Sequence, residues 1–118
     1  MGNFKKLLIW QESMDLVKEI YIITNKDSFS KDFSLKDQIR RSSYSIPSNI
    51  AEGDESGSNK QSIRYFKIAN GSTAELITQL NISFNIGYIT KEELIFLENK
   101  SEKVSIMIRK LIKSREQT

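Results

Sequence analysis

The chain has 118 residues, 38% of them hydrophobic and 28% charged, which is typical of one folded domain, here residues 1–118, rather than of a disordered chain. It has neither cysteine nor histidine, which excludes disulfides, thiolate chemistry and the side chain that most often binds metals or transfers protons near neutral pH. The net charge of +3 permits nucleic-acid binding without requiring it, and one proline with five glycines favours long helices over an all-β fold.

The first predicted helix covers residues 8–24. Its apolar side chains recur at helical spacing as one stripe with a shoulder beside it: Trp10, Met14, Val17 and Tyr21, then Leu16, Ile20 and Ile23. We expect the stripe to face the core, and a base-stacking role for Trp10 and Tyr21 is the alternative.

The start of the chain is too short and too polar for a signal peptide, and no apolar run approaches the length of a membrane span. We therefore expect a cytoplasmic protein with no membrane partner.

A polar loop is predicted over residues 25–33, with Phe29 as an apolar plug that closes the core. The second helix is predicted to open at Ser34, where Ser-x-x-Asp resembles a capping box that ends on Asp37. We expect this helix to continue to about Glu52.

The only proline of the chain, Pro47, falls inside the second predicted helix. Proline has no N–H to donate, and its ring collides with the carbonyl group four residues earlier, on Ser43. The apolar period nevertheless continues across it, from Ile39 through Ile46 to Ile50. The sequence therefore predicts one helix that is kinked at the proline rather than two separate helices.

A second, polar stripe runs beside the apolar face of this helix, through Gln38, Arg41, Ser45, Ser48, Asn49 and Glu52. One bundle core can bury only one face of a helix, so the polar stripe is free for another contact. We expect Arg41, Ser45, Asn49 and Glu52 to form an interface between copies of the chain.

The third predicted helix follows a glycine- and serine-rich linker over residues 53–59, and Ser58-x-x-Gln61 is its N-terminal cap. Gly71 interrupts this helix, and a glycine inside a helix costs about 1 kcal/mol against alanine. We attribute it to the close approach of a neighbouring helix. Gly87 is predicted to end the helix in the left-handed conformation.

The fourth predicted helix opens at the capping box Thr90-x-x-Glu93, and its last residues, 114–118, are expected to fray. Four helices joined by short connections predict an all-α fold. The expected arrangement is an antiparallel up-down-up-down four-helix bundle with a proline-kinked second helix.

Several short motifs occur along the chain in the order found in a known family. They are Ile9-Trp10-Gln11, Met14-Asp15-Leu16-Val17, Gln38-Ile39-Arg40-Arg41, Ser45-Ile46-Pro47-Ser48-Asn49-Ile50-Ala51-Glu52-Gly53, Glu75-Leu76, Thr78-Gln79-Leu80 and Gly87-Tyr88. With them the chain resembles the bacterial four-helix-bundle proteins encoded by intervening sequences in 23S ribosomal RNA genes. The run around Pro47 is the most specific motif, because few families place a proline inside such a helix.

The resemblance implies a bundle that assembles into a ring-shaped homopentamer and has no established enzymatic activity. It also implies a distant kinship with the accessory protein of diversity-generating retroelements, a pentameric bundle that works with nucleic acid and a reverse transcriptase. The partners it suggests are further copies of the chain and RNA or DNA.

Lys60, Arg64 and Lys67 form a basic stripe at the start of the third predicted helix. A row of cations on one face suits contacts with phosphates, and a solvated face paired with Asp54 and Glu55 is the alternative. A second basic cluster ends the fourth helix, at Arg109, Lys110, Lys113 and Arg115, where the helix dipole itself favours cations.

Two adjacent arginines receive different predictions, because they lie about a hundred degrees apart on a helix. Arg41 is expected to form an ion pair with Glu75, within or between subunits, and Arg40 to be an exposed contact for nucleic acid.

Neither a metal site nor a catalytic centre is predicted. Asn49 and Glu52 lack convergent ligands, and we find no pair of acids in a plausible cleft. The leading interpretation is a non-enzymatic oligomeric module that associates with RNA or an RNA-containing complex, without a cofactor. The alternative is a structural or protein-interaction module with no nucleic-acid role, and a carboxylate enzyme is the third candidate.

Overall fold

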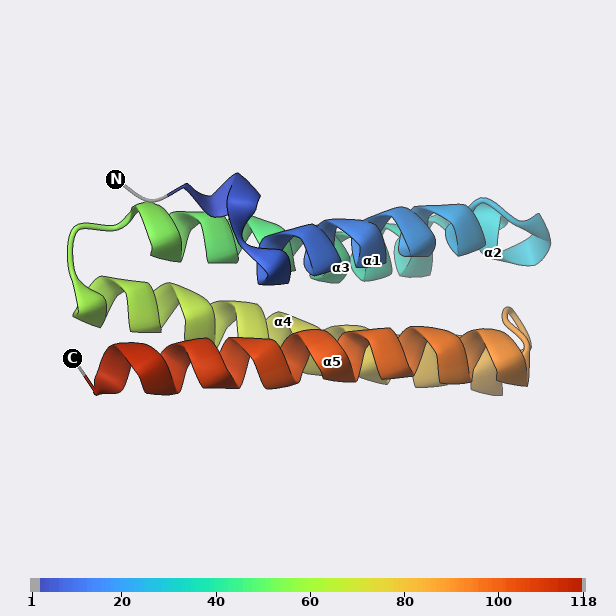
Figure 1. Ribbon diagram of the computed structural model, residues 1–118. Coiled ribbons are helices and arrows are strands. Elements are labelled where there is room, and N and C mark those ends of the chain that lie inside the picture. Colours follow the sequence, from blue (N-terminus) through green and yellow to red (C-terminus); the bar gives the residue numbers. More distant parts are fainter. Residues whose placement is uncertain (1–2, 118) are drawn as a thin grey trace.

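The computed structural model describes residues 3–117, and every regular element within them is a helix. The elements are η1 (Phe4–Lys6), α1 (Leu8–Thr24), α2 (Asp27–Lys31), α3 (Phe33–Glu55), α4 (Asn59–Asn85) and α5 (Lys91–Glu116). The long helices α1, α3, α4 and α5 lie side by side in an elongated bundle, with principal extents of 46 × 21 × 20 Å (Figure 1). Both α1 and α4 pack against α3 and α5, so each long helix has two long neighbours. No helix within residues 3–117 combines the length and the apolar character needed to cross a bilayer.

The core is a single cluster of apolar side chains drawn from all four long helices. It includes Leu16 and Ile20, Ile39 and Ile46, Phe66 and Leu76, and Val104 and Ile108, each at most 1% exposed. Burying a side chain of this size contributes about 1.5–3 kcal/mol.

Serine and threonine hydroxyls are buried among these apolar side chains. Many bond to a carbonyl one turn back on their own helix: Ser101 Oγ donates to Leu97 O at 2.7 Å and Thr24 Oγ1 donates to Ile20 O at 2.8 Å. These hydroxyls are therefore satisfied without a partner from another helix.

The bounds of α1 match the prediction, but the side of it that faces the core does not. Its buried residues are the predicted shoulder, Leu16, Ile20 and Ile23, with Ile9, Ser13 and Thr24. Met14 and Tyr21 are 43% and 37% exposed, so the core role predicted for them is wrong, while Trp10 packs half-buried against the core. The reason is that α1 has two neighbours, and the stripe that begins at Trp10 lies on the flank beside α3.

The segment predicted as a loop over residues 25–33 contains the short helix α2. Phe29 closes this end of the core as expected, since it is 1% exposed and its ring lies 5.2 Å from that of Tyr88. The hydroxyl of Tyr88 donates to Asp32 Oδ2 at 2.9 Å, and this hydrogen bond to a carboxylate raises the pKa of Tyr88.

The start of α3 differs from the prediction, because the cap is Asp32 and not Ser34. The Asp32 carboxylate accepts the N–H of Leu35 at 3.1 Å, and carboxylates are strong caps. Helix α3 then continues through the buried Pro47 to Glu55, so the prediction of one continuous helix is confirmed.

The caps predicted for α4 and α5 are confirmed. Ser58 accepts the N–H of Gln61 at 3.2 Å, and only residues 56–58 separate α3 from α4. Gly87 has φ of +85°, and its N–H and that of Tyr88 bond back to α4 in the Schellman pattern. Thr90 and Glu93 form the complete capping box.

The glycine that permits close helix packing is Gly53, not Gly71. A Cβ on Gly53 would lie 2.7 Å from Phe66 Cδ1, so α3 and α4 can approach here only without a side chain. Gly71 is exposed and nothing lies within 4 Å of the position of its Cβ. The close approach predicted for Gly71 is therefore wrong within the chain.

We expect opposite effects from the same substitution at these two glycines. Gly71→Ala should raise the free energy of unfolding by about 0.5–1 kcal/mol through helix propensity. Gly53→Ala should lower it by about 1–3 kcal/mol through overpacking against Phe66. Urea denaturation of both variants at low protein concentration tests this, and a stabilising Gly53→Ala would contradict the packing argument.

The capping carboxylate of α5 makes stability depend on pH. Burial opposes ionisation of Glu93, but the Thr90 N–H and Lys26 Nζ, 3.2 Å away, outweigh it and lower its pKa. Because the folded pKa is lowered, this stabilisation is complete above the unfolded pKa and disappears as the pH falls through the folded value. We expect the free energy of unfolding to fall between roughly pH 5 and pH 3, less steeply in Glu93→Gln, which keeps the cap without the charge. Identical pH profiles in urea denaturation would contradict this.

Candidate nucleic-acid interface

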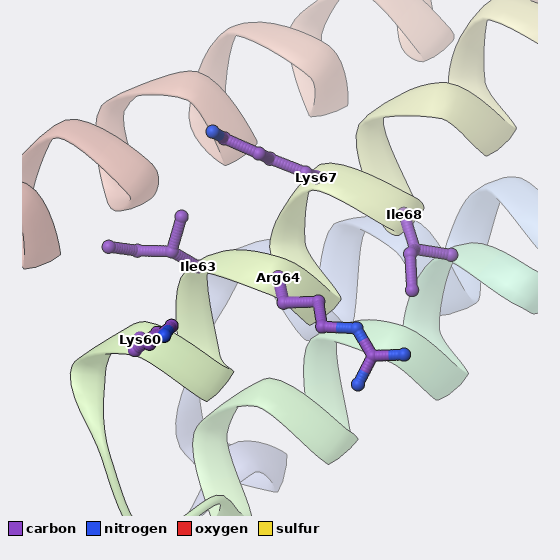
Figure 2. A pocket seen from close by; sticks show the side chains of 5 residues that line it. All are labelled: Lys60, Ile63, Arg64, Lys67 and Ile68. Carbon is purple, nitrogen blue, oxygen red and sulfur yellow. The ribbon is translucent and has the colours of Figure 1, made fainter.

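Three exposed cations lie on the first half of α4, where residues 59–74 contain no acidic side chain. Lys60, Arg64 and Lys67 line a shallow open hollow together with Ile63 and Ile68. In Figure 2, Lys67 and Ile63 extend toward the α5 side of α4, and Arg64 and Ile68 extend toward the other side. The three predicted cations are therefore exposed along one stretch of α4, but the side chains of Arg64 and Lys67 extend in different directions.

The second half of α5 runs beside this part of α4. Ser105 Oγ donates to Asn70 Oδ1 at 2.8 Å, and further along α5 the Arg115 guanidinium lies 3.5 Å from Ser62 Oγ. The start of α4 and the end of α5 consequently meet at the same end of the bundle (Figure 1).

Residues 103–115 contain five basic side chains and no acidic one. Arg109, Lys110 and Lys113 are exposed. The basic stretches of α4 and α5 thus adjoin, and their surface is called the basic end below.

The alternative in which Asp54 and Glu55 neutralise the stripe does not match the structure. Asp54 Oδ1 lies 3.6 Å from Arg115 Nη2, and that guanidinium also stacks 5.6 Å above the Phe66 ring. Within residues 3–117, Lys60 and Lys67 form no ion pair. Lys60, Lys67 and Lys113 are therefore available to an anionic partner, whereas Arg115 is already paired with Asp54.

Arg40 is not the exposed residue that the sequence predicted. Its Nε donates to Thr24 Oγ1 at 2.8 Å, its Nη2 donates to Asn25 Oδ1 at 2.9 Å, and the guanidinium lies 4.2 Å above the Tyr21 ring. Arg41, by contrast, is exposed. The hundred-degree separation is correct, but α1 packs on the side of Arg40, so Arg40 is the half-buried residue of the two and Arg41 the exposed one.

The residues predicted for an interface between copies divide into two pairs. Ser45 and Asn49 are half-buried between α3 and α4, where Ser72 Oγ donates to Ser45 Oγ at 2.9 Å and Asn49 Nδ2 donates to Ser45 O at 2.8 Å. Arg41 and Glu52 are exposed. Their role in assembly stays a prediction.

The ion pair predicted between Arg41 and Glu75 is not formed within residues 3–117, and both side chains are exposed.

Ion pairs that the sequence did not reveal join α1 to α5. Lys103 Nζ lies 3.1 Å from Glu12 Oε1, and Lys100 pairs with Asp15. The hydrogen bond from Lys100 lowers the pKa of Asp15. The two residues of each pair are more than eighty positions apart in the chain, so no local pattern could have paired them.

The described residues offer no metal site, since no group of three or more carboxylates within 3–117 is arranged to hold a metal ion.

Comparison with known proteins gives the family. The model of the 23S rRNA-intervening sequence proteins matches residues 5–110. The chain belongs to this family. Its fold also matches the crystal structure of a protein of unknown function from the S23 ribosomal protein family of Bacteroides thetaiotaomicron VPI-5482, with a TM-score of 0.83 and 26% identity. That match covers 90% of this chain and 99% of the other. Among proteins with curated descriptions, none matches the chain significantly.

The two adjacent arginines provide a direct test of the geometry. Arg40→Met should lower the free energy of unfolding by about 1–2 kcal/mol, because it removes two hydrogen bonds and the contact with Tyr21. The matched variant Arg41→Met should change it by about 0.5 kcal/mol or less, as is usual for an exposed site. Equal losses in thermal denaturation of the two variants would contradict the assignment.

Proposed function

We propose that this protein is a non-enzymatic, self-associating module that binds RNA, or an RNA-containing complex, through its basic end. The observation that carries this proposal is the adjacency of two acid-free basic stretches, residues 59–74 on α4 and 103–115 on α5. The exposed cations of the two helices, Lys60 and Lys67 with Lys113, give the surface an excess of positive charge at one end of a chain whose net charge is only +3.

The chemistry of this surface favours phosphate contacts over base reading. Its hollow is lined by the cations and by two isoleucines, and the aromatic residues beside them in the sequence, Tyr65 and Phe66, are half-buried and buried. Stacking of bases usually requires exposed aromatic faces, whereas lysines bind phosphates of any sequence. We therefore expect affinity with little sequence preference.

The resemblance to the family adds the rest of the proposal. The four long helices form an antiparallel up-down-up-down bundle in which α3 bends at Pro47, and copies assemble into a ring, for which five is the expected number. A closed ring would multiply the basic ends and arrange them around one axis. The expected location is the cytoplasm.

A protein-interaction role is the second candidate, because the opposite flank of the bundle carries an open apolar groove between α1 and α3. Trp10, Met14, Tyr44 and Pro47 line it, and Met14 and Tyr44 are 43% and 45% exposed. Exposed apolar side chains that gather in a groove are typical of protein contacts.

Salt-dependent RNA binding tests the proposal. We expect fluorescence anisotropy with a labelled RNA to show binding at low salt that weakens steeply as salt rises, because each phosphate contact releases counterions. Lys60→Glu, Lys67→Glu and Lys113→Glu combined should reduce affinity by at least about a hundredfold. The matched control carries the same charge change elsewhere, as Lys18→Glu, Lys31→Glu and Lys91→Glu. Absence of binding by the unaltered protein at low salt, or equal losses in the two variants, would favour the protein-interaction role.

A further inference from the structure

Two neighbouring helices carry the same pattern of charge and spacing over four residues. The first residue is an arginine, the two middle residues are uncharged and the last is a glutamate. On α3 it reads Arg41, Ser45, Ser48 and Glu52, and on α4 it reads Arg64, Ile68, Gly71 and Glu75. The spacing is four, three and four residues in both, so each set lies along one side of its helix. This spacing reads the same in both directions, and reversing the direction exchanges a positive end for a negative one.

The midpoints of the two sets lie at the same level in the bundle. Helices α3 and α4 run in opposite directions here, because Ser45 contacts Ser72 while Gly53, further along α3, accepts from Ser62, which lies earlier on α4. Counting from the Ser45–Ser72 contact at about 1.5 Å per residue places the two midpoints within about 2 Å of each other along the bundle axis. A single two-fold axis can therefore pass through both.

The four charged side chains are exposed, and within residues 3–117 none of them pairs with an opposite charge; the Arg64 guanidinium lies 5.9 Å above the ring of its neighbour Tyr65. No ion pair or hydrogen bond within residues 3–117 involves Arg41, Glu52, Arg64 or Glu75.

The centre of this face has a gap and a side chain that fits it. Gly71 leaves open space, with nothing within 4 Å of where its Cβ would stand. Ile68, one turn away on the same side of α4, is 44% exposed. In an antiparallel pairing of α4 with itself, Ile68 falls opposite Gly71, and Arg64 falls opposite Glu75.

We infer that the exposed face of α3 and α4 is a two-fold contact between two copies of this chain. Helix α4 packs antiparallel on the partner's α4, so Ile68 fills the space over Gly71 of the partner subunit and Arg64 pairs with Glu75 of the partner subunit. About the same axis, α3 packs on the partner's α3 and Arg41 pairs with Glu52 of the partner subunit. The contact thus contains four pairs of opposite charge, two from the α4 helices and two from the α3 helices.

A second orientation, with α3 over the partner's α4, would also join opposite charges. It would set Ile68 against a serine of α3 and leave the space over Gly71 empty. The antiparallel orientation is the one that uses both the isoleucine and the glycine.

This inference rests on the proposed self-association and adds its geometry. A two-fold contact joins copies in pairs, whereas a ring is closed by a contact between two different faces. A ring of five that also used this face would pair with a second ring, giving ten copies.

Charge reversal with rescue by mixing tests the contact, measured by sedimentation velocity over a range of concentrations. Arg64→Glu and Glu75→Arg should each raise the dissociation constant at least about tenfold, because each places like charges opposite one another twice. An equimolar mixture of the two variants should associate again, since every pair between unlike chains is then of opposite charge. Glu102→Arg, an exposed change on α5, is the control and should leave association unchanged.

Gly71→Leu supplies a second readout that does not depend on charge. The open space around Gly71 accommodates the side chain within the chain, so circular dichroism should show an unchanged helical fold. Association should weaken about tenfold or more, because the new side chain occupies the place of Ile68 from the partner subunit.

Each result has a distinct meaning. If the unaltered protein sediments as a monomer at every concentration, both self-association and this contact fail. If it associates but neither charge reversal nor Gly71→Leu weakens association, the contact alone is wrong. Rescue of Glu75→Arg by Arg41→Glu instead of Arg64→Glu would overturn the antiparallel orientation.

Discussion

The arrangement of this bundle depends on one close approach, at the end where α3 and α4 are connected. Gly53 has no side chain, so the Phe66 ring lies directly against the α3 backbone and is completely buried. The Arg115 guanidinium stacks above that ring and pairs with Asp54. A glycine on one helix, a ring on the second and a cation on the third therefore set how the end of α5 lies against the start of α4. The basic end lies beside this contact, where the two cationic stretches adjoin.

Elsewhere the core contains many buried hydroxyl side chains among its apolar residues. Ten serines and threonines within the described residues are buried, and most of them donate a hydrogen bond to a carbonyl of their own helix. They occupy little volume and need no specific partner across the interior, so neighbouring helices approach closely there. Specific polar contacts between helices are fewer, such as the Ser45–Ser72 and Ser105–Asn70 pairs between α3, α4 and α5.

Local patterns along the chain predicted local structure well. The four long helices, three of their terminal signals and the continuity of α3 through Pro47 follow from periodicity and capping chemistry, which act over a few residues. The predictions that depended on which neighbour a helix face meets were less successful. Tyr21 is at the surface, where the Arg40 guanidinium lies above its ring, and the glycine needed for close packing is Gly53, the first residue of the predicted linker.

The candidate site shows the same division. Composition along α4 and α5 located the cations, but only the fold shows that they share one end and that Asp54 is already occupied by Arg115. The exposure of Arg40 and Arg41 is the reverse of the prediction for the same reason, because a helix pattern gives the angle between two side chains and not the direction in which the next helix lies.

The end of α5 was expected to fray over residues 114–118. Thr118 lies outside the described residues, but the helix extends to Glu116. Arg115 contacts Asp54 of α3 and the Phe66 ring of α4, so it is held where three helices meet. The last turn of α5 therefore holds the end of α3 and the start of α4 together through Arg115. Shortening the protein from this terminus would remove the only described cation that covers Phe66 and leave the Asp54 carboxylate buried without its counter-ion. An uncompensated buried charge costs several kcal/mol, so in this protein the terminal turn belongs to the folding unit itself.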